Sequence, residues 1–105
     1  PTVVTPAEAL AAATVNGMRS QGRMDSGFVR QGMKADLIVL DVNQPWMVPV
    51  NDWTTNLVYS VQGSDVCLTM VDGRVLYRDG EYPTIDIEKV MYETQRATDD
   101  IRAQL

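Results

Sequence analysis

The side chains that could do chemistry in this 105-residue chain are carboxylates, one thiol and a few hydroxyls. The sequence contains no histidine, which is the commonest zinc ligand in proteins and the usual general base near neutral pH. Cys67 therefore has no imidazole to deprotonate it, and its place inside a predicted strand favours a packing role. The serines lack a partner base for the same reason: Ser20, Ser26, Ser60 and Ser64.

The aspartates are numerous, but they follow no metal-binding pattern. Most fall at predicted strand ends, turns and helix starts, where aspartate is favoured for backbone reasons: Asp36, Asp41, Asp52, Asp65, Asp72, Asp79, Asp86, Asp99 and Asp100. No calcium loop of the Asp-x-Asp-x-Asp-Gly type and no phosphate-binding glycine loop is present in the sequence. We therefore assign no catalytic, cofactor-binding or metal-binding residue to this chain, and we expect it to hold no cofactor of its own.

Composition and charge exclude several classes of partner. The net charge of −5 argues against nucleic acid and against an anionic membrane, because both require a basic surface. The sequence shows neither a membrane-length apolar run nor a signal-peptide leader. One cysteine fits a reducing, cytoplasmic location. The first residue is Pro1, not methionine, which we interpret as truncation or proteolysis of a longer polypeptide.

The elements that must position these side chains centre on residues 36–41. Four consecutive apolar residues, Leu37 to Leu40, lie between two aspartates, and such a run predicts a strand buried on both faces. Residues 42–51 are predicted as a loop, where Trp46 either walls a ligand site or, more commonly for a loop tryptophan, anchors packing. Trp53 opens the next predicted helix and allows the same two interpretations.

Three helices are predicted from capping signals. Thr5 and Glu8 form a capping box with Pro6 between them, which predicts one helix continuing to Ser20. Asp52 is expected to cap a short helix over residues 53–59. Thr84 is expected to cap a final amphipathic helix that docks on another surface through one stripe of residues: Ile87, Val90, Met91, Thr94, Ala97, Ile101 and Leu105.

A β-hairpin is predicted over residues 66–78. Asp72-Gly73 is a favoured two-residue type I′ turn, and it sets the register so that Val71 faces Arg74, Met70 faces Val75 and Leu68 faces Tyr77. Asp79-Gly80 predicts a second turn. Helices combined with a small antiparallel sheet place the chain in the α+β class.

Several of these segments together resemble a known family, the amidohydrolase superfamily. The resemblance covers nearly the whole chain and is narrowest for the branch of chlorohydrolases and aminohydrolases that includes methylthioadenosine/S-adenosylhomocysteine deaminases and s-triazine hydrolases. It rests on Glu8-Ala9-Leu10 and Ala13-Thr14-Val15-Asn16-Gly17, Gly32-Met33-Lys34-Ala35-Asp36-Leu37, Asn56-Leu57-Val58-Tyr59, Gly63-Ser64-Asp65-Val66 and Val71-Asp72-Gly73-Arg74-Val75. The sequence departs from that pattern at Trp46, where relatives often have histidine, and at Met33.

The resemblance implies a (β/α)8-barrel parent with one divalent metal, zinc or iron, whose ligands lie outside this chain. Residues 1–31 would then be a helix and loop from the end of the barrel. Residues 32–82 would form the C-terminal half of a β-sandwich, and residues 83–105 a C-terminal amphipathic helix.

Two functions follow as alternatives. The first is a C-terminal fragment of a metal-dependent amidohydrolase, a deaminase or chlorohydrolase acting on C–N or C–Cl bonds of a nitrogen heterocycle; the fragment is structural and not an enzyme by itself. Its expected partners are the missing N-terminal part of the parent chain and, through self-association, other copies. The second is an autonomous, non-catalytic β module for binding or oligomerisation.

Overall fold

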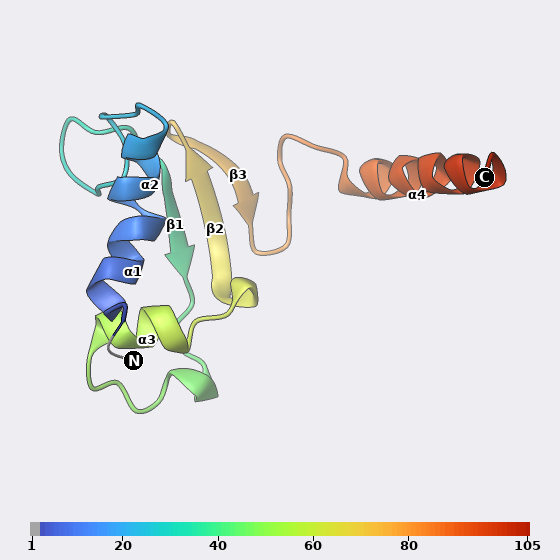
Figure 1. Cartoon of the computed structure of the whole chain (residues 1–105). Coiled ribbons are helices and arrows are strands. Elements are labelled where there is room, and N and C mark those ends of the chain that lie inside the picture. Colours follow the sequence, from blue (N-terminus) through green and yellow to red (C-terminus); the bar gives the residue numbers. More distant parts are fainter. Residues whose placement is uncertain (1–2) are drawn as a thin grey trace.

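A computed structural model describes residues 3–105 of the chain. Helices and a three-stranded antiparallel sheet of order β1-β2-β3 make up the fold, which confirms the α+β class (Figure 1). The elements are α1 (Pro6–Ala13), α2 (Val15–Ser20), β1 (Leu37–Leu40), the 3-10 turn η1 (Pro45–Met47), α3 (Trp53–Tyr59), the 3-10 turn η2 (Gly63–Asp65), β2 (Val66–Val71), β3 (Arg74–Arg78) and α4 (Ile87–Ala103). The (β/α)8 barrel and the β-sandwich implied by the family resemblance remain predictions.

The first predicted helix is two helices. The Thr5–Glu8 capping box is confirmed, with the Thr5 amide donating to Glu8 Oε2 at 2.8 Å. The single helix to Ser20 was wrong, because Thr14 leaves the helical region (φ −119°, ψ −97°) and separates α1 from α2. The Thr14 hydroxyl donates to the Leu10 carbonyl oxygen at 2.7 Å, a bond back to residue i−4 that tends to bend helices.

The apolar strand β1 forms as predicted, but its burial does not. β1 pairs with β2 alone and lies at one edge of the sheet. Ile38 is 55% exposed and Val39 is 45% exposed, so the prediction of a strand buried on both faces was wrong for this chain. The physical reason is that the described residues place no second layer over this strand. Its apolar composition indicates suitability for burial, whereas burial itself requires a partner surface.

The hairpin of β2 and β3 confirms the predicted turn and two of the three predicted residue pairs. Asp72 and Gly73 both have positive φ (49° and 77°), as a type I′ turn requires. Val71 pairs with Arg74 and Met70 with Val75. The pairing of Leu68 with Tyr77 was wrong: an irregularity between Thr69 and Met70 shifts the register, so Tyr77 faces Thr69 and Leu68 faces Arg78. An extra residue in one strand causes such a shift.

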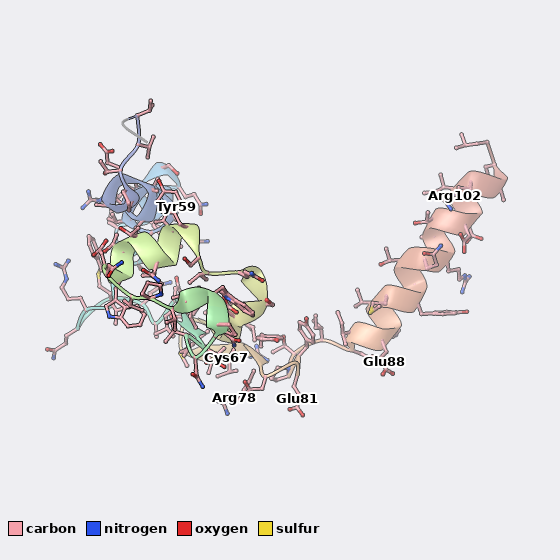
Figure 2. All side chains as sticks on the ribbon, turned by 90° about the horizontal axis from the view of Figure 1, so that it is seen from below. Tyr59, Cys67, Arg78, Glu81, Glu88 and Arg102 are labelled. Carbon is pink, nitrogen blue, oxygen red and sulfur yellow. The ribbon has the colours of Figure 1, made fainter. Side chains whose placement is uncertain are left out.

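The final helix begins later than predicted and stands apart from the sheet. Its N-cap is Asp86, whose carboxylate accepts from the Lys89 amide at 3.1 Å, so Thr84 as the cap was wrong. Two perpendicular views show α4 projecting beyond the body formed by the sheet and α1–α3 (Figures 1 and 2). The radius of gyration is 18.0 Å, against about 13 Å for a compact domain of this length.

Candidate functional site

The polar side chains that the fold buries are the natural places to look for a site. Among the described residues these are Ser26, Asn56 and Asp65. Because a buried polar group requires hydrogen-bond partners, each marks a point at which two segments are joined. Sequence reasoning did not single out Ser26 or Asn56 for these contacts. The mid-helix position of Asn56, a poor helix former, is the signal that could have found it.

Asp36 joins the loop before β1 to the hairpin turn. Its Oδ2 accepts from the Ser26 hydroxyl at 2.8 Å, and its Oδ1 accepts from the Asp72 amide at 2.7 Å. The Gly73 amide donates to the Ala35 carbonyl oxygen at 3.1 Å beside it. The Asp72 amide, then the Ser26 hydroxyl, lower the pKa of Asp36 below its usual 3.8. Both carboxylate oxygens are thus engaged, and the group is a weak base suited to holding structure.

An open depression lies next to Asp36, with a volume of about 740 Å³. Arg23, Lys34 and Asp25 contribute charges of both signs to its rim, and Lys34 Nζ lies 3.8 Å from Asp25 Oδ2. The Ser26 hydroxyl also lines this depression, and it donates its hydrogen bond to Asp36. Since Asp36 is held as a weak base, this pair is a poor means of activating a nucleophile. The depression is a polar boundary between the loop that precedes β1 and the turn that follows β2.

Asp65 anchors the loop that contains Trp46. Its Oδ2 accepts from the Trp46 indole Nε1 at 2.9 Å and from the Gln62 amide at 2.8 Å. The Asp41 amide donates to the Asp65 carbonyl oxygen at 2.8 Å, at the end of β1. Trp46 is therefore oriented by this carboxylate, while its side chain remains 41% exposed. Trp53 is 54% exposed on α3, and no ring contact between the two tryptophans occurs among the described residues.

Asn56 joins α3 to the same loop. Its Nδ2 donates to the Met47 carbonyl oxygen at 3.1 Å and to the Pro49 carbonyl oxygen at 3.4 Å. Met47 is 1% exposed, which makes it the best-buried apolar side chain among the described residues. The amide thus satisfies two carbonyl groups above the most buried part of the molecule.

The remaining candidate residues are dispersed. Asp52 and Asp86 cap helices, while Asp72 and Asp79 occupy turns with φ of 49° and 46°. Cys67 lies in β2, with Sγ 3.4 Å from the Val39 carbonyl oxygen. Nowhere in residues 3–105 do three or more His, Cys, Asp or Glu side chains gather in a way that could hold a metal ion. The donor groups described here do not fit a zinc or iron centre.

Comparison with known proteins identifies a matching family and similar sequences. The model of the amidohydrolase family matches residues 1–76. A 5-methylthioadenosine/S-adenosylhomocysteine deaminase of Dictyoglomus thermophilum is 45% identical over 96 residues, which are 91% of this chain and 22% of the relative. A 5′-deoxyadenosine deaminase of Methanosarcina mazei is 39% identical over 105 residues, which are 100% of this chain and 24% of the relative.

Solved structures agree with the sequence relatives. A zinc-bound adenosine deaminase from Xanthomonas campestris superposes with a TM-score of 0.89 at 25% identity, over 94% of this chain and 23% of that one. A zinc-bound atrazine chlorohydrolase from Arthrobacter aurescens gives a TM-score of 0.79 at 25% identity, over 88% of this chain and 20% of that one.

The chain spans between a fifth and a quarter of the length of these relatives. Within residues 3–105, none of the helices has the length and apolarity needed to cross a bilayer. A family match over residues 1–76, supported by a relative 45% identical across nine-tenths of the chain, shows that this protein belongs to the amidohydrolase family.

Proposed function

We propose that this chain is the C-terminal segment of a metal-dependent amidohydrolase that removes the amino group of an adenine ring, and that it contributes structure rather than catalytic residues. The observation that carries this proposal is the 45% identity to a deaminase over 91% of the chain. The buried contacts support a structural role, since Asp36, Asn56 and Asp65 each hold backbone groups in place.

The percentage identities to known relatives favour a deaminase over a chlorohydrolase. Relatives named for 5′-deoxyadenosine or methylthioadenosine deamination are 38–45% identical to this chain, whereas the atrazine chlorohydrolase is 25% identical. The substrate class that follows is a 5′-substituted adenosine. The zinc in two of the structural neighbours supports a divalent metal in the whole enzyme, and its ligands would come from outside this chain.

Each part of the chain has a proposed place in that enzyme. Residues 1–31, with α1 and α2, would close the end of the barrel. Residues 32–82 would supply the sheet and hairpin of the smaller β domain, and residues 83–105 the terminal helix. The partner of all three is the preceding part of an amidohydrolase polypeptide. The exposure of Ile38 and Val39, which point to opposite faces of the sheet, supports this arrangement, because uncovered apolar side chains are suited to contact with adjoining parts of the protein.

A chimera tests the proposal. The segment of the D. thermophilum deaminase that aligns with this chain is replaced by residues 1–105, and the purified product is assayed for ammonia release from 5′-deoxyadenosine, methylthioadenosine and atrazine. We expect a soluble, zinc-containing enzyme that deaminates both nucleosides. The same enzyme with the segment deleted is the control and is expected to be insoluble or inactive.

An insoluble chimera beside a soluble parent would contradict the proposal. A deletion variant that keeps full activity would contradict it as well, because the segment would then serve as a separate binding or oligomerisation module.

A further inference from the structure

Helix α4 carries a continuous apolar stripe that no described residue covers. At 100° per residue the stripe occupies about a third of the helix circumference, and mainly charged residues, with Tyr92, Gln95 and Ala103, fill the rest. Val90, Met91 and Ile101 within it are 46%, 66% and 61% exposed. The stripe comprises Ile87, Val90, Met91, Thr94, Ala97, Thr98 and Ile101, and Leu105 follows just beyond the end of α4.

The two threonines do not interrupt the stripe. The Thr94 hydroxyl donates to the Val90 carbonyl oxygen at 2.7 Å, and the Thr98 hydroxyl donates to the Thr94 carbonyl oxygen at 3.0 Å. Both polar groups are satisfied inside the helix, so burying this face leaves no hydroxyl without a partner. The stripe can therefore be desolvated as a whole.

The segment at the end of β3, which precedes α4, is held by local contacts. Asp79 and Gly80 form a tight turn with φ of 46° and 87°, and Arg78 pairs with Glu81 across it. The rings of Tyr77 and Tyr82 meet edge to face with centroids 5.2 Å apart. Figure 2 shows Arg78 and Glu81 near the point where the chain leaves the sheet, Glu88 at the start of α4 and Arg102 near its far end.

The solved adenosine deaminase gives further information on the direction of α4. Because α4 has 17 residues, the 94% of this chain that superposes on that structure includes most of the helix. A TM-score of 0.89 requires α4 to project in nearly the same direction there. In that protein the matched part is 23% of the chain, so the same fold occurs there as one part of a much longer polypeptide.

We infer that the α4 stripe docks on the preceding part of the amidohydrolase polypeptide, so that this chain holds the larger body with two separate surfaces, the sheet region and the projecting helix. This inference rests on the proposed function and specifies the partner surface. The occupant is an apolar protein surface. A bilayer is disfavoured by the composition of the polar side of α4, where Glu88, Glu93, Asp99 and Asp100 face only three basic residues, Lys89, Arg96 and Arg102.

Two neighbouring residues give a matched pair of variants for the test. Met91 lies in the stripe at 66% exposure, and Tyr92 lies outside it at 68% exposure. In the chimera described above, Met91→Glu is expected to lower the melting temperature by about 5 °C, because it places a charge against an apolar surface. Tyr92→Glu is expected to change it by about 1 °C or less. Ile101→Glu repeats the stripe variant further along the helix.

Peroxide oxidation of Met91, followed by mass spectrometry, gives a readout independent of stability. We expect Met91 to react at least about tenfold more slowly in the unmodified chimera than in the isolated chain. In the isolated chain, both glutamate variants should melt like the unmodified protein.

The outcomes separate this inference from the proposed function. A folded, active chimera in which Met91→Glu and Tyr92→Glu melt alike, or in which Met91 stays fully reactive, would overturn the docking surface alone. An isolated chain whose dimer is abolished by Met91→Glu, combined with a reactive Met91 in the chimera, would assign the stripe to a second copy and also overturn it. A chimera that does not fold beside a soluble parent would overturn both.

Discussion

Individual polar residues hold this fold together at points far apart in the sequence. Asp36 binds the amide of Asp72, which is 36 positions later, and Asp65 binds the indole of Trp46, which is 19 positions earlier. The aspartates were predicted at turns and strand ends for backbone reasons, and Asp36, Asp52 and Asp86 do accept from backbone amides. The particular partner of Asp36 could not be predicted, because nothing local in either segment identifies the other.

The lowered pKa of Asp36 makes a prediction about acid stability. Since the folded state binds this proton more weakly than the unfolded state does, protonation favours unfolding. Stability from Asp36 is therefore present above its usual pKa of 3.8 and is lost as the pH falls below it. We expect Asp36→Asn to unfold more easily at pH 7 and to lose less stability between pH 5 and pH 2 than the parent.

Urea titrations at a series of pH values measure this effect. Some acid sensitivity should remain, because hydrogen bonds from Thr5 and Thr55 lower the pKa values of Glu8 and Asp52. Asp100→Asn, at an exposed helical position, is the control and should keep the parent's pH dependence. An Asp36→Asn variant whose pH dependence equals that of the parent would show that this carboxylate is not held as described.

Asn56 makes a prediction about stability at neutral pH. Asn56→Ala removes the donor from the carbonyl groups of Met47 and Pro49 in a buried position, and we expect a loss of about 1–3 kcal/mol of unfolding free energy. Asn16→Ala, on an exposed part of α2, should change it by about 0.5 kcal/mol or less. Chemical denaturation of both variants compares them directly, and equal midpoints would contradict a buried anchoring role for Asn56.

At the scale of elements, the sequence correctly predicted helix caps and a hairpin turn, which depend on residues close together in the chain. The Thr5 and Asp52 caps and the Asp72-Gly73 turn form as predicted, because a cap or a two-residue turn is determined by residues within one turn of the chain. The break at Thr14 was missed because a threonine hydroxyl can bond to the carbonyl at i−4 without ending a helix, as Thr94 and Thr98 do in α4. The irregularity beside Thr69 was missed because the turn sets the register only near itself. The exposure of Ile38 was missed because burial depends on a covering layer.

The hairpin turn should be among the least tolerant positions in the chain. Gly73 has a φ of 77°, so Gly73→Val forces a β-branched residue into the left-handed region, at an expected cost of about 1–3 kcal/mol. Gly63→Val is a matched control, because Gly63 does not have positive φ and an added Cβ there meets nothing within 4 Å. Thermal melts should rank Gly73→Val well below Gly63→Val; the reverse order would show that the turn tolerates other conformations.

At the scale of the whole molecule, the chain exposes apolar surface on both the sheet and α4. β1 is an edge strand with Ile38 uncovered, and an unpaired strand edge invites another chain to pair with it. We therefore expect the isolated chain to self-associate at micromolar concentrations or to be weakly stable.

Sedimentation over a range of concentrations tests this expectation. Ile38→Lys should weaken the association, whereas Val29→Lys, at a loop residue that is 90% exposed, should not. A compact, highly stable monomer at every concentration would contradict the expectation.

The central claim is that this chain completes an amidohydrolase without supplying its chemistry. The most direct measurement is metal content and ammonia release, carried out side by side on the isolated chain and on the chimera with the D. thermophilum deaminase. We predict close to one zinc or iron per molecule and turnover of 5′-deoxyadenosine for the chimera, and neither for the isolated chain after dialysis. One tightly held transition metal per isolated chain, or ammonia release that survives repurification, would contradict the claim.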